Sequence, residues 1–140
     1  MVLGAGGVVP FLGISVALWL APAKHINVLA TALVAYAAVI LSFLGAVHWG
    51  LAMARPAGDG WRWYGLGVAP ALVAWGATWL APAPALGVLV LAFAGALALD
   101  LSAVAAGRAP RWYRSLRVPL SLAVMACLAL GGAAVWVSGP

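Results

Sequence analysis

Hydrophobic residues fill five stretches of the chain, and four short breaks rich in proline, glycine or charge separate them. Each stretch has about the 20 apolar residues that a helix needs to cross the hydrocarbon core of a bilayer. Helices are therefore expected over residues 4–21, 26–54, 61–80, 84–106 and 116–137. This pattern predicts one domain over residues 1–140, an all-α, five-helix transmembrane bundle.

Composition supports a membrane environment. Of the 140 residues, 67% are hydrophobic and 6% are charged, whereas an average soluble domain has roughly 25% charged residues. Membrane lipid accepts such an apolar surface, and it is the partner that the sequence most directly implies. The net charge of +5 does not indicate a nucleic-acid partner, because the basic residues lie in short connections between apolar stretches.

Basic residues are divided unequally between the two sides of the predicted bundle. With five spans, Lys24 lies on one side, and the side that holds the N-terminus has all the arginines: Arg55, Arg62, Arg108, Arg111, Arg114 and Arg117. Cytoplasmic connections collect Lys and Arg, so the N-terminus is predicted to be cytoplasmic and the C-terminus outside. No positive residue precedes the first apolar stretch, as a cleaved signal peptide requires, so this stretch is retained as a helix.

Small residues recur every four positions in the second predicted helix, at Ala38, Ser42, Ala46, Gly50 and Ala54. Helices associate in lipid through close packing, and small residues allow their backbones to approach. The second helix is therefore expected at the centre of the bundle, with a neighbouring helix against this stripe.

Two titratable side chains lie well inside the apolar stretches, His48 in the second helix and Asp100 in the fourth. Counting back to Arg55 and Arg108 at about 1.5 Å per residue places both roughly 10–12 Å in from the arginine side. A lone carboxylate in lipid costs about 2.5–3.5 kcal/mol or more, so Asp100 needs a partner. The candidates are His48, an indole N–H of Trp49 or Trp75, and an arginine of the connection before the fifth helix.

Three prolines fall inside predicted helices at a similar depth, namely Pro10, Pro70 and Pro119. Each proline removes one backbone N–H and frees a carbonyl one turn earlier. Such carbonyls need partners or a wet cavity, so the sequence predicts a polar layer open toward the cytoplasm. The candidate ligand-binding residues are His48, Asp100, Trp49, Trp75, Pro70 and Ser42, in a pocket between the second, third and fourth helices.

Signals for defined catalytic chemistry are not found in the sequence. No glycine-rich phosphate loop, metal-ligand spacing or serine nucleophile elbow is present. No catalytic or metal-binding residue is therefore assigned, and the sequence favours a binding protein over an enzyme. The cofactor is undefined, and a haem or quinone site stays open.

The run SFLGAVHWG at residues 42–50 resembles the most distinctive part of the transmembrane protein 69-like family. Residues 70–75 and 111–117 are similar to later segments of that family. The resemblance implies a multi-pass protein of the bacterial inner (cytoplasmic) membrane with mitochondrial relatives. It implies no activity, because this domain has no known function, and therefore no site residue either.

A second likeness is to the tryptophan-rich sensory protein, or translocator, family of five-helix bundles that bind porphyrins and sterol-like ligands. Residues 112–119, Trp-Tyr-Arg-Ser-Leu-Arg-Val-Pro, are similar to its Trp-Tyr…Leu…Pro loop. In that family the loop joins the first two helices, whereas here the motif precedes the last helix. The likeness implies, by analogy, that such a bundle can hold a tetrapyrrole or a sterol-like molecule.

These observations give three functional hypotheses. The first is a membrane protein that binds, and moves, a small apolar or protonatable ligand, or a proton, at an intramembrane His48/Asp100 layer near the cytoplasmic side. The second is a structural or assembly subunit without its own ligand, for which a homo-oligomer or another membrane protein is the partner. The third is a membrane-embedded enzyme in which the His–Asp pair performs acid–base work.

Overall fold

The computed structural model of the chain describes residues 6–54 and 60–139. Within these residues all regular structure is helical. The helices are α2 (Val9–Leu20), α3 (Ala23–Met53), α4 (Gly60–Ala77), α5 (Pro82–Ala105) and α6 (Arg111–Ser138). The prediction of an all-α bundle is confirmed for the described part of the chain.

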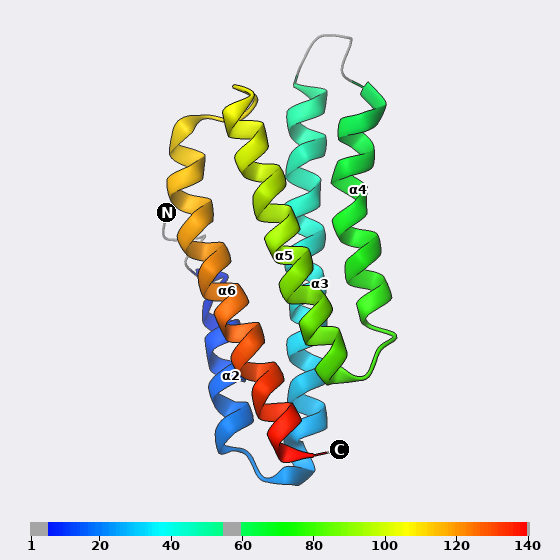
Figure 1. Cartoon of the computed structure of the whole chain (residues 1–140), viewed down its shortest axis with the longest axis vertical. Helices are drawn as coiled ribbons and strands as arrows, with labels where there is room; N and C mark the ends of the chain where they lie inside the picture. The colour runs from blue at the N-terminus through cyan, green and yellow to red at the C-terminus, as the bar shows by residue number, and fades with distance from the viewer. Residues whose placement is uncertain (1–5, 55–59, 140) are drawn as a thin grey trace.

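Helix α3 is the centre of the bundle, as the sequence predicts, because it contacts each of the other four helices. It packs most extensively on α4, while α5 packs most extensively on α6. Figure 1 shows α3, α5 and α6 running along most of the long axis, with α2 beside one half of the bundle and α4 beside the other.

Three of the described helices, α3, α5 and α6, are long and apolar enough to cross a membrane, and they indicate a membrane protein. Helix α2 has 12 residues, a length of about 18 Å, against about 30 Å of hydrocarbon. The candidate spans thus number three in the described residues, where the hydropathy pattern predicts five.

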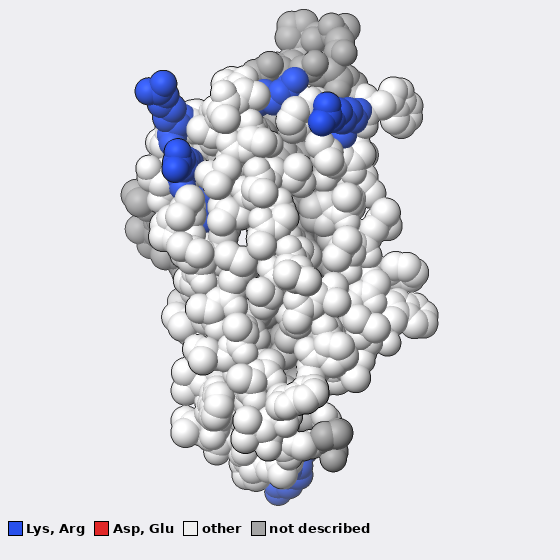
Figure 2. Space-filling model, viewed as in Figure 1, with Lys and Arg blue, Asp and Glu red and all other residues white. Residues whose placement is uncertain are grey.

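Charge is concentrated at the two ends of the molecule. Figure 2 shows Lys and Arg side chains around one end and a single basic group at the other, with no acidic atom visible on this face. Arg55 and Asp59, in the connection between α3 and α4, lie outside the described residues. Tryptophans at both ends are exposed, among them Trp61 and Trp112 at one end and Trp79 and Trp136 at the other. This exposure is typical of residues at a membrane interface.

Two helix starts differ from the prediction. Helix α6 begins at Arg111, directly after Pro110, and not near residue 116, so Arg117 lies almost two turns inside the helix. In α2, Pro10 is in the first turn, where no helical partner is needed for its missing N–H. The expectation that Pro10 lies inside a helix and frees a carbonyl there is therefore wrong, whereas Pro70 and Pro119 do lie inside α4 and α6.

Helices α3 and α4 touch through a pair of glycines. A Cβ on Gly45 would overlap the carbonyl oxygen of Gly67. The predicted small-residue stripe is not this contact, since Ala46 and Gly50 are exposed and a Cβ on Gly50 would meet nothing within 4 Å. The expectation that a neighbouring helix of the chain covers the stripe is therefore wrong for Ala46, Gly50 and Ala54, which are exposed, whereas Ala38 is partly buried against the core.

Candidate functional site

A buried cluster of ionisable side chains joins the three long helices. His48 Nε2 on α3 lies 3.2 Å from Asp100 Oδ1 on α5, and Arg117 Nε on α6 lies 2.5 Å from Asp100 Oδ2. His48 and Asp100 are each 2% exposed and Arg117 is 6% exposed. A carboxylate isolated in this layer would be costly, and the arginine removes most of that cost by direct pairing.

The connection between α5 and α6 places Arg117 against Asp100. Gly107 has a φ of 66°, the left-handed conformation that ends many helices. Backbone N–H groups of Gly107 and Arg108 donate to the carbonyls of Val104 and Ala103, which closes the end of α5 and turns the chain back toward the bundle. Helix α6 then starts at Arg111 and runs antiparallel beside α5 (Figure 1).

Tyr113 and Arg117 lie one turn apart on the same face of α6. The Tyr113 hydroxyl donates a hydrogen bond of 3.3 Å to Asp100 Oδ1. Asp100 thus accepts from side chains of α6 through both oxygens, while His48 approaches it from α3. The carboxylate is the point where the three long helices meet.

An aromatic ring covers the far side of the histidine. The His48 and Trp63 rings are stacked at 6.3 Å between centroids with an interplanar angle of 20°. The guanidinium carbon of Arg108 lies 4.0 Å from the centroid of the Trp63 ring, a distance typical of a cation–π contact. Trp63, from α4, therefore separates the buried imidazole from the arginine-rich end.

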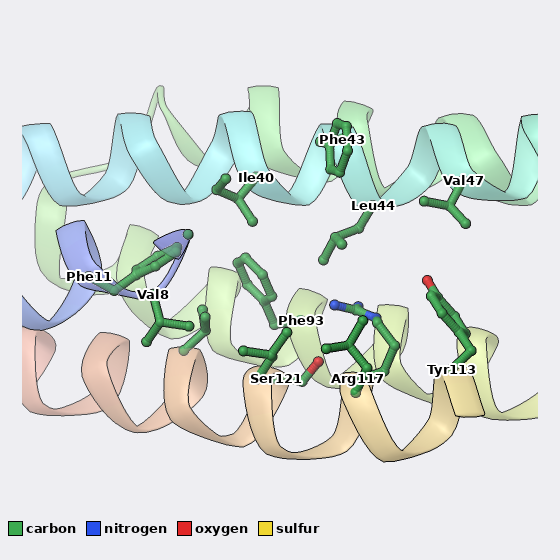
Figure 3. Close-up of a pocket in the computed structure, with 14 residues that line it drawn as sticks. Val8, Phe11, Ile40, Phe43, Leu44, Val47, Phe93, Tyr113, Arg117 and Ser121 are labelled. Atoms are coloured by element: carbon green, nitrogen blue, oxygen red, sulfur yellow. The ribbon is translucent and has the colours of Figure 1, made fainter. Parts of the chain in front are cut away.

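A cavity of about 290 Å³ lies next to this cluster, between α2, α3, α5 and α6. Its walls are apolar, and its polar groups come from α6: Tyr113, Arg117 and Ser121. Figure 3 shows Leu44 of α3 facing the nitrogen atoms of Arg117 and Val47 facing Tyr113, with Val8 and Phe11, at the start of α2, toward the other end. Phe43, which is 67% exposed, also borders the cavity.

Two residues that border the cavity each have a buried polar atom without a hydrogen-bond partner within the described part of the protein. These atoms are Arg117 Nη2 and Ser121 Oγ; His48 Nδ1, also buried, has none either. Buried polar groups nearly always have a partner. Unsatisfied donors on residues that line an apolar cavity are therefore suited to the polar head of a ligand.

The structure brings the two central candidates together and separates the others from them. His48 and Asp100, which the sequence places at equal depth without deciding whether they touch, are in contact. Trp49 and Trp75 are 42% and 62% exposed; Trp49 donates to the carbonyl of Tyr64, and Trp75 packs on Trp79. The predicted pocket lined by these tryptophans is therefore corrected, because the Trp75 ring is exposed and the partly exposed Trp49 ring packs against Gly67 and Tyr64 of α4.

The two remaining candidates also lie away from the cavity. Ser42 donates its hydroxyl to the carbonyl of Ala38 in its own helix at 2.8 Å. Pro70 is in contact range of a Cβ on Gly45 and borders an apolar groove between α4 and α5. Neither residue lines the cavity beside Arg117.

Sequence reasoning missed Arg117, Tyr113, Trp63 and Ser121 as members of this site. Arg117 was counted as a cytoplasmic charge, although an arginine reaching inward was among the expected partners of Asp100. The available signal was Pro110, which caps a helix start and implies that Tyr113 and Arg117 share a helical face.

Among the described residues, no group of three His, Cys, Asp or Glu side chains is placed to hold a metal ion. The chemistry that the cluster offers is hydrogen bonding to an acceptor, charge compensation and proton exchange at His48. The cavity walls offer an apolar surface for the rest of a ligand.

Comparison with known proteins gives one match. No curated protein and no solved structure matches the chain. The sequence model of a family described as "Protein of unknown function (DUF3429)" matches residues 1–133. Because this match covers nearly the whole bundle, including His48, Asp100 and Arg117, the chain belongs to the DUF3429 family.

Proposed function

We propose that this chain is a small multi-pass membrane protein that binds a small, largely apolar ligand in the cavity beside the His48–Asp100–Arg117 cluster. The observation that carries the proposal is the pair of buried, unpartnered polar atoms, Arg117 Nη2 and Ser121 Oγ, on two residues that line an apolar cavity. If Arg117 and Ser121 only packed the bundle, these polar atoms would be expected to have hydrogen-bond partners or to be replaced by apolar groups. Movement of the ligand, or of a proton through His48, would use the same site.

The topology of the proposal follows from charge. The arginine-rich end is placed in the cytoplasm of a bacterium, at its inner membrane, with the N-terminus inside, the C-terminus outside and five crossings. The positive-inside rule and the resemblance to the transmembrane protein 69-like family support this arrangement. The cluster then lies near the cytoplasmic side, within the membrane.

The size of the cavity favours a slim ligand. Its volume of about 290 Å³ is at the lower end of the roughly 300–1,000 Å³ usual for ligand sites. A tetrapyrrole or sterol-like ligand, the analogy from the translocator family, would need the cavity to widen. Phe43 at the exposed border gives such a ligand a route from the lipid.

Filling the cavity tests the proposal. Val124 is 5% exposed and borders the cavity, so Val124→Phe should occupy the space and reduce bound ligand at least about tenfold, the equivalent of roughly 1.4 kcal/mol. The measurement is mass spectrometry of the small molecules that copurify with each protein from native membranes, expressed per mole of protein.

Leu122→Phe is the matched control, because Leu122 is 55% exposed on the same helix. This variant should retain the molecules found with the unmodified protein. Thermal unfolding in the same detergent checks that both variants are folded. An identical set and amount of molecules in all three proteins would contradict the proposal.

A structural or assembly subunit is the alternative. The observation that favours it is the exposed small-residue surface of α3 at Ala46 and Gly50, which no helix of the chain covers among the described residues. This alternative predicts that Gly50→Leu disrupts a complex with a second copy or another membrane protein, as measured by crosslinking in native membranes. If the protein has no such partner, Gly50→Leu should give the same crosslinking pattern as the unmodified chain.

A further inference from the structure

The unpartnered atoms of the cavity define the chemistry of the ligand's head. Arg117 Nη2 is a donor without acceptor capacity, and Ser121, one turn further along α6, has a hydroxyl that can donate as well. A carboxylate has two oxygens that only accept when ionised, and its hydrogen bonds to a guanidinium are roughly twice as strong as neutral ones. The two donors therefore match the two oxygens of one carboxylate.

Charge compensation limits how a carboxylate can enter. Arg117 already pairs with Asp100, so their charges cancel. A second carboxylate on Arg117 would leave one uncompensated negative charge among residues that are 6% exposed or less. Burying an unpaired charge is expensive, so binding requires a further positive charge in the cluster.

His48 is the group that can supply this charge. Its Nε2 lies 3.2 Å from Asp100 Oδ1, and its buried Nδ1 has no partner among the described residues. Histidine changes charge near neutral pH. The charged and titratable groups facing the cluster are Asp100 from α5 and Arg117 with Tyr113 from α6.

Within residues 6–54 and 60–139, the other packed helices contribute no competing acid. From α4, the Trp63 ring covers the imidazole, and Arg108 lies on the Trp63 ring. Helix α2 carries no titratable side chain between Val9 and Leu20. A protonated imidazole would therefore stay next to Asp100 and keep the whole cluster neutral once the ligand's carboxylate is bound.

We propose that the ligand is an acidic amphiphile, and that its carboxylate binds Arg117 and Ser121 together with uptake of one proton by His48. The proton comes from the aqueous phase and bonds to Nδ1, while Nε2 keeps its contact with Asp100. One anion and one proton thus enter together, and no covalent bond of the ligand changes. This inference rests on the proposed function of the cavity and adds the class of its ligand.

Calorimetric titration of the protein in nanodiscs tests the inference, with decanoate as the probe and decanol as its uncharged equivalent. Empty nanodiscs correct for partition into lipid. Titrations at about pH 5 to 8, the range in which histidine ordinarily titrates, and in buffers of different ionisation enthalpy give the number of protons taken up. The expected result at the upper end of this range is one proton per bound decanoate and an affinity that falls about tenfold per pH unit. Decanol should bind without proton uptake.

Two variants test whether His48 takes up the proton and whether Ser121 binds the carboxylate. His48→Gln should abolish proton uptake and the pH dependence of decanoate binding, while decanol binds as before. Ser121→Ala leaves the ion cluster intact and should weaken decanoate about tenfold, in line with loss of one hydrogen bond to a charged group. Ser102→Ala is the control, because Ser102 is exposed and donates to Leu99 of its own helix.

Several outcomes would overturn the inference. Proton uptake that persists in His48→Gln would mean that the proton goes to the ligand or to Asp100. Equal affinities for decanol and decanoate at every pH would remove the carboxylate but leave the cavity as a binding site. Failure of both probes to bind would reject an amphiphile of this kind, whereas the Val124→Phe experiment decides separately whether the cavity binds anything.

Discussion

One turn of α3 has two different neighbourhoods. Gly45 meets Gly67 of α4 so closely that a methyl group would not fit between them. Leu44 and Val47, on the other side of the same turn, border a cavity of about 290 Å³. Between these two surfaces His48 reaches Asp100 on α5. A single helical turn therefore packs closely on one side and stays open on the other.

The difference shows which interactions hold the bundle together and which leave room for function. The glycine contact allows the α3 and α4 backbones to approach, which favours association of helices in lipid. On the cavity side the helices α3, α5 and α6 are joined by the ion cluster around Asp100. Polar contacts hold this side together next to an unfilled space, which fits a site that accepts a ligand.

Breaking the ion cluster should have the largest effect. Asp100→Leu leaves the Arg117 guanidinium buried without its carboxylate, and loss of one partner of a buried pair costs about 3–5 kcal/mol. The double change Asp100→Leu with Arg117→Met removes both charges and should recover most of that stability. Denaturation in mixed detergent micelles, followed by circular dichroism, measures the free energy of unfolding for each variant.

Ser102→Ala serves as the control for that series, because Ser102 is exposed two residues from Asp100 and bonds only to its own helix in the hydrogen bonds observed. If Asp100→Leu unfolds with the same free energy as Ser102→Ala, the cluster does not stabilise the junction of the three helices. A double variant as unstable as the single one would show that shape, and not charge, is responsible.

A change at the glycine contact should alter the free energy of unfolding less than the ion-cluster variants do, and it tests the side of α3 that faces α4. Gly45→Ala forces α3 away from α4 and should cost about 1–3 kcal/mol, as overpacking usually does. Gly50→Ala places its methyl group in open space and should stabilise the helix by up to about 1 kcal/mol. The same unfolding measurement compares them; equal stabilities would mean that the contact with Gly67 is not needed.

Hydropathy and charge predict the fold class and the common depth of His48 and Asp100. Each apolar stretch corresponds to a helix in the described residues. The sequence places His48 and Asp100 at the same depth from the arginines and names His48 as one candidate partner of Asp100; the two are 3.2 Å apart. The depth of a side chain in the membrane follows from its residue number along the helix, because each residue adds a fixed rise.

Rotation about each helix axis could not be obtained in the same way. In lipid the outside of a bundle is as apolar as its inside, so the pattern does not separate buried from exposed faces. Trp49 and Trp75 were assigned to a pocket for this reason, yet both are exposed. The start of α6 at Arg111 moved Arg117 from a connection into the site, a shift of a few residues that hydropathy alone does not detect.

Substitution of two buried serines should change the free energy of unfolding least. It compares a closely packed position directly with one beside the cavity. Ser15 on α2 donates its hydroxyl to the carbonyl of Cys127 at 2.8 Å, whereas Ser121 Oγ has no partner in the part of the chain that is described. Ser15→Ala should therefore destabilise the protein by about 1 kcal/mol, while Ser121→Ala should leave the free energy of unfolding unchanged or raise it slightly. If Ser121→Ala destabilises as much as Ser15→Ala in protein stripped of bound small molecules, then Ser121 is a packing residue with a partner inside the bundle, and its hydroxyl is not reserved for a ligand.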